Sequence, residues 1–145
     1  MFGSFIFLVD DNAAHRTLVK RAIAKAGIAY SIVEAGSLEE ARTRLFGKDS
    51  NVHPIITIVD LNLGDGRGTT LIAELRASSS LRDLPVLVLS TSPLENDMRE
   101  SYQQGASCYL TKADDVSKFT SEIGAAVRFL VEIVAQRGDS LQATG

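Results

Sequence analysis

The stretch FIFLVDD at residues 5–11 decides the fold, together with IITIVD at residues 55–60. Each apolar run has the length and the β-branched or aromatic content of a strand that is buried on both faces of a sheet. Acidic residues close both runs, Asp10 and Asp11 the first and Asp60 the second. Because open α/β sheets bind ligands at the carboxyl ends of their strands, we expect these three acids to share one sheet edge.

These three acids predict a metal site. No basic residue adjoins them in the sequence, so no neighbour along the chain neutralises their charge. Clustered carboxylates repel one another, and a hard divalent cation with oxygen ligands is the simplest relief. We therefore expect Asp10, Asp11 and Asp60 to hold Mg²⁺.

The rest of the chain alternates between strand and helix patterns. Further strands are predicted at residues 30–34, 86–89 and 108–111, and helices at residues 13–26, 38–46, 69–77, 93–104 and 115–136. The expected N-caps are Asn12, Ser37, Ser92 and either Asp114 or Asp115, with Pro93 as a first helical residue and Gly27 and Gly105 just past helix ends. The glycine-rich residues 64–68 are expected to form a loop.

Five strands alternating with five helices predict an α/β fold, a doubly wound, flavodoxin-like parallel sheet with helices on both faces. Right-handed crossovers favour the strand order 2-1-3-4-5, in which the first and third strands are neighbours. The ends of the fourth and fifth strands then bring Ser90, Thr91 and Lys112 to the edge that carries the acids. At 145 residues, the chain predicts one domain over residues 1–137 and a flexible tail over residues 138–145.

Composition narrows the function classes. The net charge of −3 comes from mixed signs without a Lys/Arg cluster, which argues against direct binding to nucleic acid and favours a protein partner. A single cysteine, Cys108, excludes an intramolecular disulfide and a cysteine-based zinc site. No apolar run reaches the roughly 18 residues of a membrane span, and the first strand lacks the basic flank of a signal peptide. We expect a soluble, cytoplasmic protein.

Carboxylates, a hydroxyl and a lysine at one edge are the groups that phosphoryl transfer requires, and an aspartate can itself accept the phosphoryl group. At this point the chain resembles the receiver domains of two-component response regulators, over nearly its whole length from Leu8 to Val134. The resemblance is carried by Asp10-Asp11, Asp60-Leu61-Asn62 with Gly68, Pro85 to Ser90, and Tyr109 to Lys112. Together, in order and at strand ends, these fragments are highly specific.

This resemblance implies how the acidic residues act. Asp60 would accept a phosphoryl group from a sensor histidine kinase. Asp11, Asp60 and the backbone carbonyl of Asn62 would ligate Mg²⁺, and Asp10 would reach the ion through water.

The resemblance also implies how the signal leaves the site. Ser90 and Lys112 would contact phosphoryl oxygens, with Thr91 beside them, and Tyr109 would report phosphorylation to the far face. Such a protein is not an enzyme beyond its own phosphorylation and slow autodephosphorylation. The chain ends after its last helix, so it resembles the stand-alone kind, which docks to a downstream protein or passes the phosphate onward in a phosphorelay.

Some positions depart from the family's usual pattern. Ala113 follows Lys112 where proline is usual, often after a cis peptide. Because a cis bond before a non-proline residue costs about 2.5–4 kcal/mol, we expect either a trans peptide with a shifted loop or a strained exception. Gly64 also replaces a usual proline, which predicts a looser loop. Thr91 is bulkier than the usual Ala or Gly and would hinder an attacking water.

The sequence also allows other interpretations. A phosphatase of the haloacid-dehalogenase kind would want an aspartate two residues after Asp60, where this chain has Asn62. A receiver-like binding module that never needs phosphate is the main alternative, although such a chain should lose the acceptor, the hydroxyl or the lysine. His15 lacks a second His or Cys at ligand spacing, so it is better interpreted as an exposed residue of the first helix than as a phosphohistidine or metal ligand.

The final helix carries more apolar residues than one sheet face needs. One row can cover the sheet, and Val127, Val131 and Val134 form a second row beside it, to which Phe129 adds. We therefore expect a homodimer through this helix, or else a second row that merely widens the contact with the core. The expected interface residues are Phe119, Ile123, Val127, Leu130, Val131 and Val134.

Overall fold

The computed structural model, which describes residues 4–48, 53–112 and 114–144, contains the predicted parallel sheet. Its strands are β1 (Phe5–Val9), β2 (Ser31–Ala35), β3 (Ile56–Asp60), β6 (Val86–Ser90) and β7 (Cys108–Thr111). They pair in parallel in the order β2-β1-β3-β6-β7, which is the expected order once a small hairpin is counted in the numbering. The doubly wound fold is therefore confirmed.

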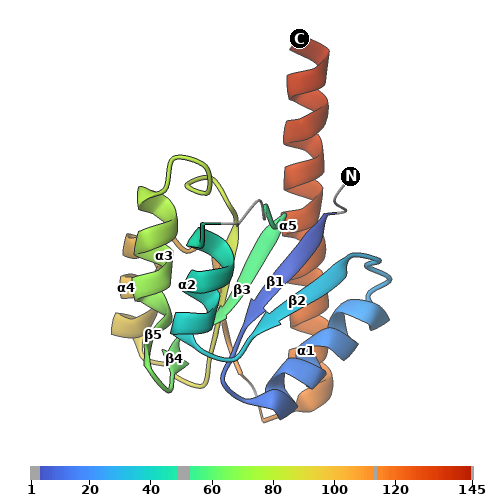
Figure 1. The fold of residues 1–145 in the computed structure, drawn as a ribbon. Coiled ribbons are helices and arrows are strands. Elements are labelled where there is room, and N and C mark those ends of the chain that lie inside the picture. Colours follow the sequence, from blue (N-terminus) through green and yellow to red (C-terminus); the bar gives the residue numbers. More distant parts are fainter. Residues whose placement is uncertain (1–3, 49–52, 113, 145) are drawn as a thin grey trace.

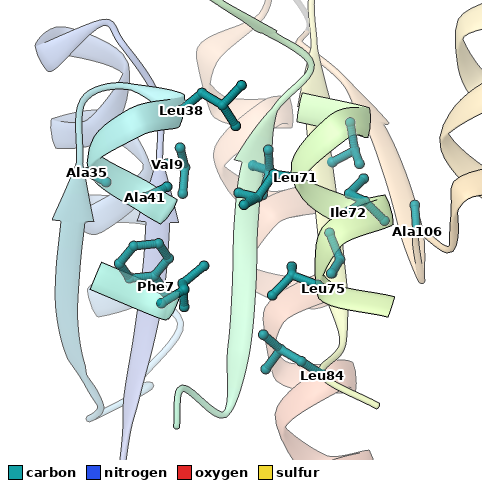
Figure 2. Close-up of a cluster of buried hydrophobic side chains, with 14 of the residues drawn as sticks. Phe7, Val9, Ala35, Leu38, Ala41, Leu71, Ile72, Leu75, Leu84 and Ala106 are labelled. Carbon is teal, nitrogen blue, oxygen red and sulfur yellow. The ribbon is translucent and has the colours of Figure 1, made fainter. Parts of the chain in front are cut away.

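Alternate residues of the central strands fill two separate cores. Phe7 and Val9 of β1 belong to one cluster of buried side chains, whereas Ile6 and Leu8 belong to the other. Figure 2 shows the first cluster, in which Phe7 and Val9 lie beside Ala41, while Ile72 lies nearer to Ala106 on the other side of the cluster. Burial on both faces explains why the strands read as continuous apolar runs.

Five helices cover the sheet on its two faces (Figure 1). The cluster around Ile6 and Leu8 is closed by α1 (Ala13–Lys25) and α5 (Val116–Thr144). The cluster around Phe7 and Val9 is closed by α2 (Leu38–Phe46) and α3 (Gly68–Ala77), with α4 (Glu95–Gln104) contributing the half-buried Met98. No helix in the described part of the chain is both long and apolar enough to cross a membrane.

Most of the expected helix caps form. The Asn12 side chain accepts hydrogen bonds from the first turn of α1, and the Ser37 hydroxyl accepts one from the first turn of α2. Gly105 ends α4 with φ of +113°, a left-handed conformation that glycine adopts without steric cost. Of the two candidate caps of α5, Asp115 accepts a hydrogen bond from the Lys118 N–H.

Two local predictions were wrong. Residues 64–68 are not a plain loop, because β4 (Asn62–Leu63) and β5 (Gly66–Arg67) form an antiparallel hairpin and Gly68 already begins α3. The helix expected after Ser92 starts at Glu95 instead of Pro93. Ser92 lies before it and uses its hydroxyl to bond Asp97 and the Leu94 N–H.

The second apolar row of α5 lies largely in the monomer's own core. Val127 is fully buried, and Val131 and Val134 pack half-buried against the same cluster. Phe119, Ile123 and Leu130, also named as interface residues, are buried there too. The row therefore widens the core contact. Phe129, which adds to that row in the sequence, is instead 62% exposed on the surface of α5.

α5 is also longer than the sequence predicts. It continues past the expected end near Gln136 to Thr144, so residues 138–144 of the expected tail are helical. Its C-terminal part extends well beyond the sheet (Figure 1).

Candidate functional site

The strand register brings the predicted site residues to one edge of the sheet. Val9 of β1 pairs with Val59 of β3, so the next residues, Asp10 and Asp60, lie side by side. β6 lies next to β3 on the side away from β1, and β7 follows it, with Ser90 at the end of β6 paired with Thr111 of β7. This edge is the switch point of the doubly wound sheet, where such folds bind ligands.

Asp10 is buried at this edge with 1% of its surface exposed. Its Oδ1 accepts a hydrogen bond from the Asn12 N–H at 2.9 Å. Burial raises the pKa of Asp10, against the opposing effects of the Asn12 N–H and the Lys112 charge. A carboxylate held in this way favours a cation beside it.

Lys112 supplies that cation. Its Nζ lies 2.9 Å from Asp60 Oδ2 and 3.5 Å from Asp10 Oδ2, and its side chain is only 9% exposed. No basic residue adjoins the acids in the sequence because their cationic partner follows β7, far away along the chain, at the edge where the topology predicts Lys112. One ammonium against two carboxylates still leaves a net negative charge.

Asp11 and Asn62 lie on the more open side of the edge. Both side chains are exposed, and Asp11 Oδ2 lies near the Gly64 backbone, where a Cβ would be 3.4 Å away. Asp11 does not belong to the group formed by Asp10, His15 and Asp60, whose ligand atoms lie within 4.8 Å of one another. The Asn62 N–H donates to Asp60 Oδ1 at 3.1 Å.

Gly68 fixes the backbone that carries Asp60. Its N–H donates to the Leu61 carbonyl at 2.7 Å. A Cβ at this position would overlap the Asp60 carbonyl and lie 2.7 Å from Val59 Cγ1. Only glycine lets α3 begin this close to the end of β3.

Ser90 and Tyr109 are joined through Ser92. The buried Ser90 Oγ accepts a hydrogen bond from the Ser92 N–H at 3.0 Å, and the Tyr109 hydroxyl donates to the Ser92 carbonyl at 2.8 Å. Tyr109 is itself buried, whereas Thr91 is exposed beside Ser90. A change at Ser90 can therefore reach Tyr109 through one residue.

Sequence reasoning missed Arg67, which ties the hairpin to α4. Its guanidinium donates to Asn62 Oδ1 at 3.1 Å, to Asp97 at 3.2 Å and to Glu100 at 3.1 Å. Asp97 also accepts a hydrogen bond from the Ser92 hydroxyl at 2.5 Å. No local sequence signal marks the contact with α4, because Asp97 and Glu100 are 30 and 33 residues from Arg67 and meet it only in the fold.

His15 is half-buried and belongs to the site. Its Nδ1 lies 3.0 Å from Lys112 Nζ and 3.8 Å from Asp10 Oδ2. The expected place of His15 in the first helix is confirmed, whereas its contacts with Lys112 and Asp10 were not predicted from the sequence. Ala113, whose peptide was expected to be unusual, lies outside the described residues.

The sequence model of the response regulator receiver domain matches residues 6–123. The chain belongs to this family. Receiver domains are signalling modules rather than classical enzymes, and the fold and the acidic edge found here agree with that assignment.

Known receiver proteins resemble this one along most of its length. Response regulator Rcp1 of Synechocystis sp. is 29% identical over 132 residues, which cover 89% of this chain and 90% of Rcp1. The crystal structure of the phosphorylated cyanobacterial phytochrome response regulator RcpA aligns with a TM-score of 0.80 at 30% identity, covering 90% of this chain and 95% of RcpA. The Mn²⁺-bound form of Rcp1 aligns with a TM-score of 0.79 at 28% identity, covering 89% and 95% of the two chains.

The donor set of this receiver domain fits a divalent cation. Asp10 and Asp60 present carboxylate oxygens that lie close together, and Lys112 compensates only one of their two charges. Hard divalent cations choose such oxygen ligands. An imidazole nitrogen such as that of His15 is not a donor that Mg²⁺ prefers.

Proposed function

We propose that Asp60 accepts a phosphoryl group from a sensor histidine kinase and that the protein is a response regulator controlled by this modification. The observation that carries the proposal is the ion pair between Asp60 Oδ2 and Lys112 Nζ at 2.9 Å, set beside Asp10 at the carboxyl edge of the sheet. An acceptor carboxylate, an ammonium for a phosphoryl oxygen and a second acid are present together.

Mg²⁺ would be held by Asp11, Asp60 and the Asn62 carbonyl, with Asp10 close by. When bound, the ion neutralises charge on the phosphoryl oxygens. The existence of a Mn²⁺-bound form of the similar protein Rcp1 supports a divalent cation at this edge.

The transfer itself uses the residues of this chain. An Asp60 oxygen attacks the phosphorus of a phosphohistidine, the P–N bond breaks with its electron pair returning to the imidazole nitrogen, and an acyl phosphate forms on Asp60. Lys112 pairs with one phosphoryl oxygen and the Ser90 hydroxyl with another. The exposed Thr91 stands beside them, where its bulk would slow hydrolysis by water.

The contacts of Ser90 can carry the effect of phosphorylation from the site to the surface around α4 and β7. When the Ser90 hydroxyl turns toward the phosphoryl group, the Ser92 segment that it bonds shifts, and with it the Tyr109 hydroxyl. The new conformation around α4 and β7 is then recognised by a downstream protein, or the phosphate is passed to a phosphotransfer protein. A homodimer through the exposed part of α5 around Phe129 is a further part of this proposal.

Labelling with acetyl phosphate tests the assignment of the acceptor. We expect the protein in Mg²⁺ to gain one phosphoryl group, in a linkage that is stable to acid, labile to base and removed by hydroxylamine. Asp60→Asn should abolish labelling, and Asp83→Asn, an exposed acid between α3 and β6, should leave it unchanged. Equal labelling of Asp60→Asn would show that another residue is the acceptor. A wild-type protein that is never labelled by acetyl phosphate or by histidine kinases would favour the phosphate-independent binding module.

A further inference from the structure

Lys112 has three partners, and the third is not an acid. Its Nζ lies 2.9 Å from Asp60 Oδ2, 3.5 Å from Asp10 Oδ2 and 3.0 Å from His15 Nδ1. An ammonium has donors only, so the contact with His15 is a hydrogen bond only if Nδ1 carries its lone pair and the ring proton resides on Nε2. The longer separation of 3.8 Å between Nδ1 and Asp10 Oδ2 agrees with this tautomer.

The backbone fixes His15 at this place. His15 lies in the first turn of α1, and its N–H donates to the Asn12 side chain at 3.1 Å. Asn12 in turn donates its own N–H to Asp10. The cap of α1 therefore sets the imidazole relative to the carboxylate that shares Lys112 with it.

His15 also forms part of the approach to Lys112 from solvent. The two side chains and Thr91 line a cavity of about 490 Å³ between the start of α1 and the start of α5. The His15 side chain is 40% exposed, whereas that of Lys112 is 9% exposed. The imidazole is therefore more exposed to solvent than the ammonium that it contacts.

An imidazole acceptor beside Lys112 has a chemical consequence. When Asp60 is phosphorylated, the Lys112 ammonium must exchange its hydrogen bond with the Asp60 carboxylate for a hydrogen bond to a phosphoryl oxygen. Without His15, the ammonium would have only the two buried carboxylates as partners and would be drawn toward Asp10. His15 can hold one N–H of Lys112 before and after the transfer, without adding a charge that would compete with the phosphoryl group.

We propose that His15 is a positioning residue, which holds the Lys112 ammonium in line with the phosphoryl oxygen through a hydrogen bond to Nδ1. This inference rests on the proposed role of Asp60 as phosphoryl acceptor. The first turn of α1 would then take part in the phosphoryl transfer together with the acids.

Two substitutions of His15 separate the hydrogen bond from packing. His15→Leu removes the acceptor and keeps the bulk, whereas His15→Asn keeps an oxygen acceptor close to the place of Nδ1. Thr17→Val, on the exposed side of α1 and in the same cavity, is the control. The rate of labelling by acetyl phosphate is measured in Mg²⁺ over a range of donor concentrations, and Mg²⁺ affinity is measured by calorimetry.

We expect His15→Leu to lower the saturating rate constant by about tenfold, the effect of losing one hydrogen bond to a charged group. The half-saturating donor concentration and the Mg²⁺ affinity should stay within about twofold of wild type, because Lys112 is misdirected but present. His15→Asn should recover most of the rate, and Thr17→Val should match wild type. Wild-type rates in His15→Leu, or equal loss in His15→Leu and His15→Asn, would overturn the proposal.

Nitrogen NMR of the imidazole gives a second readout that does not depend on labelling. We expect the Nε2–H tautomer in the wild type and a displaced Nδ1 resonance in Lys112→Met, where the donor is gone. A Nδ1–H tautomer or a doubly protonated ring at neutral pH would also overturn the proposal.

The labelling experiments distinguish failure of this proposal from failure of the proposed function. If His15→Leu is labelled like wild type while Asp60→Asn is not labelled, the role of His15 fails and the proposed function stands. Full labelling of Asp60→Asn would instead remove the proposed function.

Discussion

At the scale of single residues, one buried ammonium between two buried carboxylates determines the behaviour of the site. Lys112, Asp10 and Asp60 are each almost removed from water, so their charges interact strongly and are costly to leave unpaired. The pairing leaves one negative charge uncompensated, and Asp11 adds another at the open side. The site is therefore arranged to take up a further cation.

Lys112→Met should destabilise the metal-free protein and make it more dependent on Mg²⁺. The substitution leaves two buried carboxylates without their partner, which costs about 3 kcal/mol, and it removes the cation that competes with Mg²⁺. We expect a lower melting temperature without metal and a larger increase on adding millimolar Mg²⁺ than in wild type, measured by scanning calorimetry. Lys118→Met, at an exposed position of α5, is the control. A Lys112→Met protein as stable as wild type without metal would contradict this account.

Asp11→Ala should have a different effect. Because Asp11 is exposed and has no part in the Lys112 ion pairs, its removal relieves repulsion without breaking a buried contact. The melting temperature without metal should stay level or rise, and its increase with Mg²⁺ should shrink. A Mg²⁺ response equal to that of wild type would exclude Asp11 as a ligand. Asp83→Ala provides the matched comparison at a remote exposed acid.

At the scale of elements, the β4–β5 hairpin connects three helices. It leads into α3 through Gly68, and Arg67 binds Asp97 and Glu100 of α4. Asp65 reaches back to α2, where its carboxylate accepts hydrogen bonds from the Leu38 N–H at 2.8 Å and the Glu39 N–H at 3.0 Å. α2 is thus capped by its own Ser37 and by an acid from the hairpin.

Asp65 makes the stability of α2 depend on pH. Hydrogen bonds from the Leu38 and Glu39 backbone hold the pKa of Asp65 below its ordinary value of 3.8. Because the folded pKa is depressed, the stabilisation is fully present above the unfolded value and is lost as pH falls through the folded pKa. Asp65→Ala should lower the melting temperature by a few degrees at neutral pH, with the difference from wild type vanishing in acid. An unchanged difference at all pH values would exclude the carboxylate as its cause.

At the scale of the whole molecule, α5 offers a surface that the sheet does not use. The helix extends beyond the sheet, and Phe129 is exposed on it, whereas Val127 and its neighbours are buried in the core. The dimer contact expected from the apolar pattern therefore shifts from the second row of α5 to the surface around Phe129.

Light scattering after size exclusion tests that dimer. We expect a dimer at tens of micromolar, a monomer for Phe129→Glu, and a dimer for Phe46→Glu, which changes an exposed phenylalanine of α2 instead. Phosphorylation of Asp60 should change the dimer fraction through Tyr109. A wild-type monomer with and without phosphorylation would remove α5 as an interface.

The sequence by itself determined the order and type of the main elements, because these depend on short-range patterns. The burial of Phe7 and Ile6 on opposite faces of the sheet, the caps at Asn12 and Ser37, and the acids directly after strands are all readable within a few residues. The edge that carries Asp10, Asp60, Ser90 and Lys112 followed from the topology alone.

Only the tertiary structure decided which of the groups at that edge contact one another. Lys112 reaches Asp60, His15 and Asp10 across 52, 97 and 102 positions of sequence, and Asp65 reaches α2 across 26 or 27. The burial of Val127 depended likewise on how α5 packs against the sheet. Such contacts depend on the strand register and on the packing of the whole fold, which no local sequence pattern contains. A side chain is only a few ångströms long, so it can contact a distant residue only where the folded backbone brings the two together.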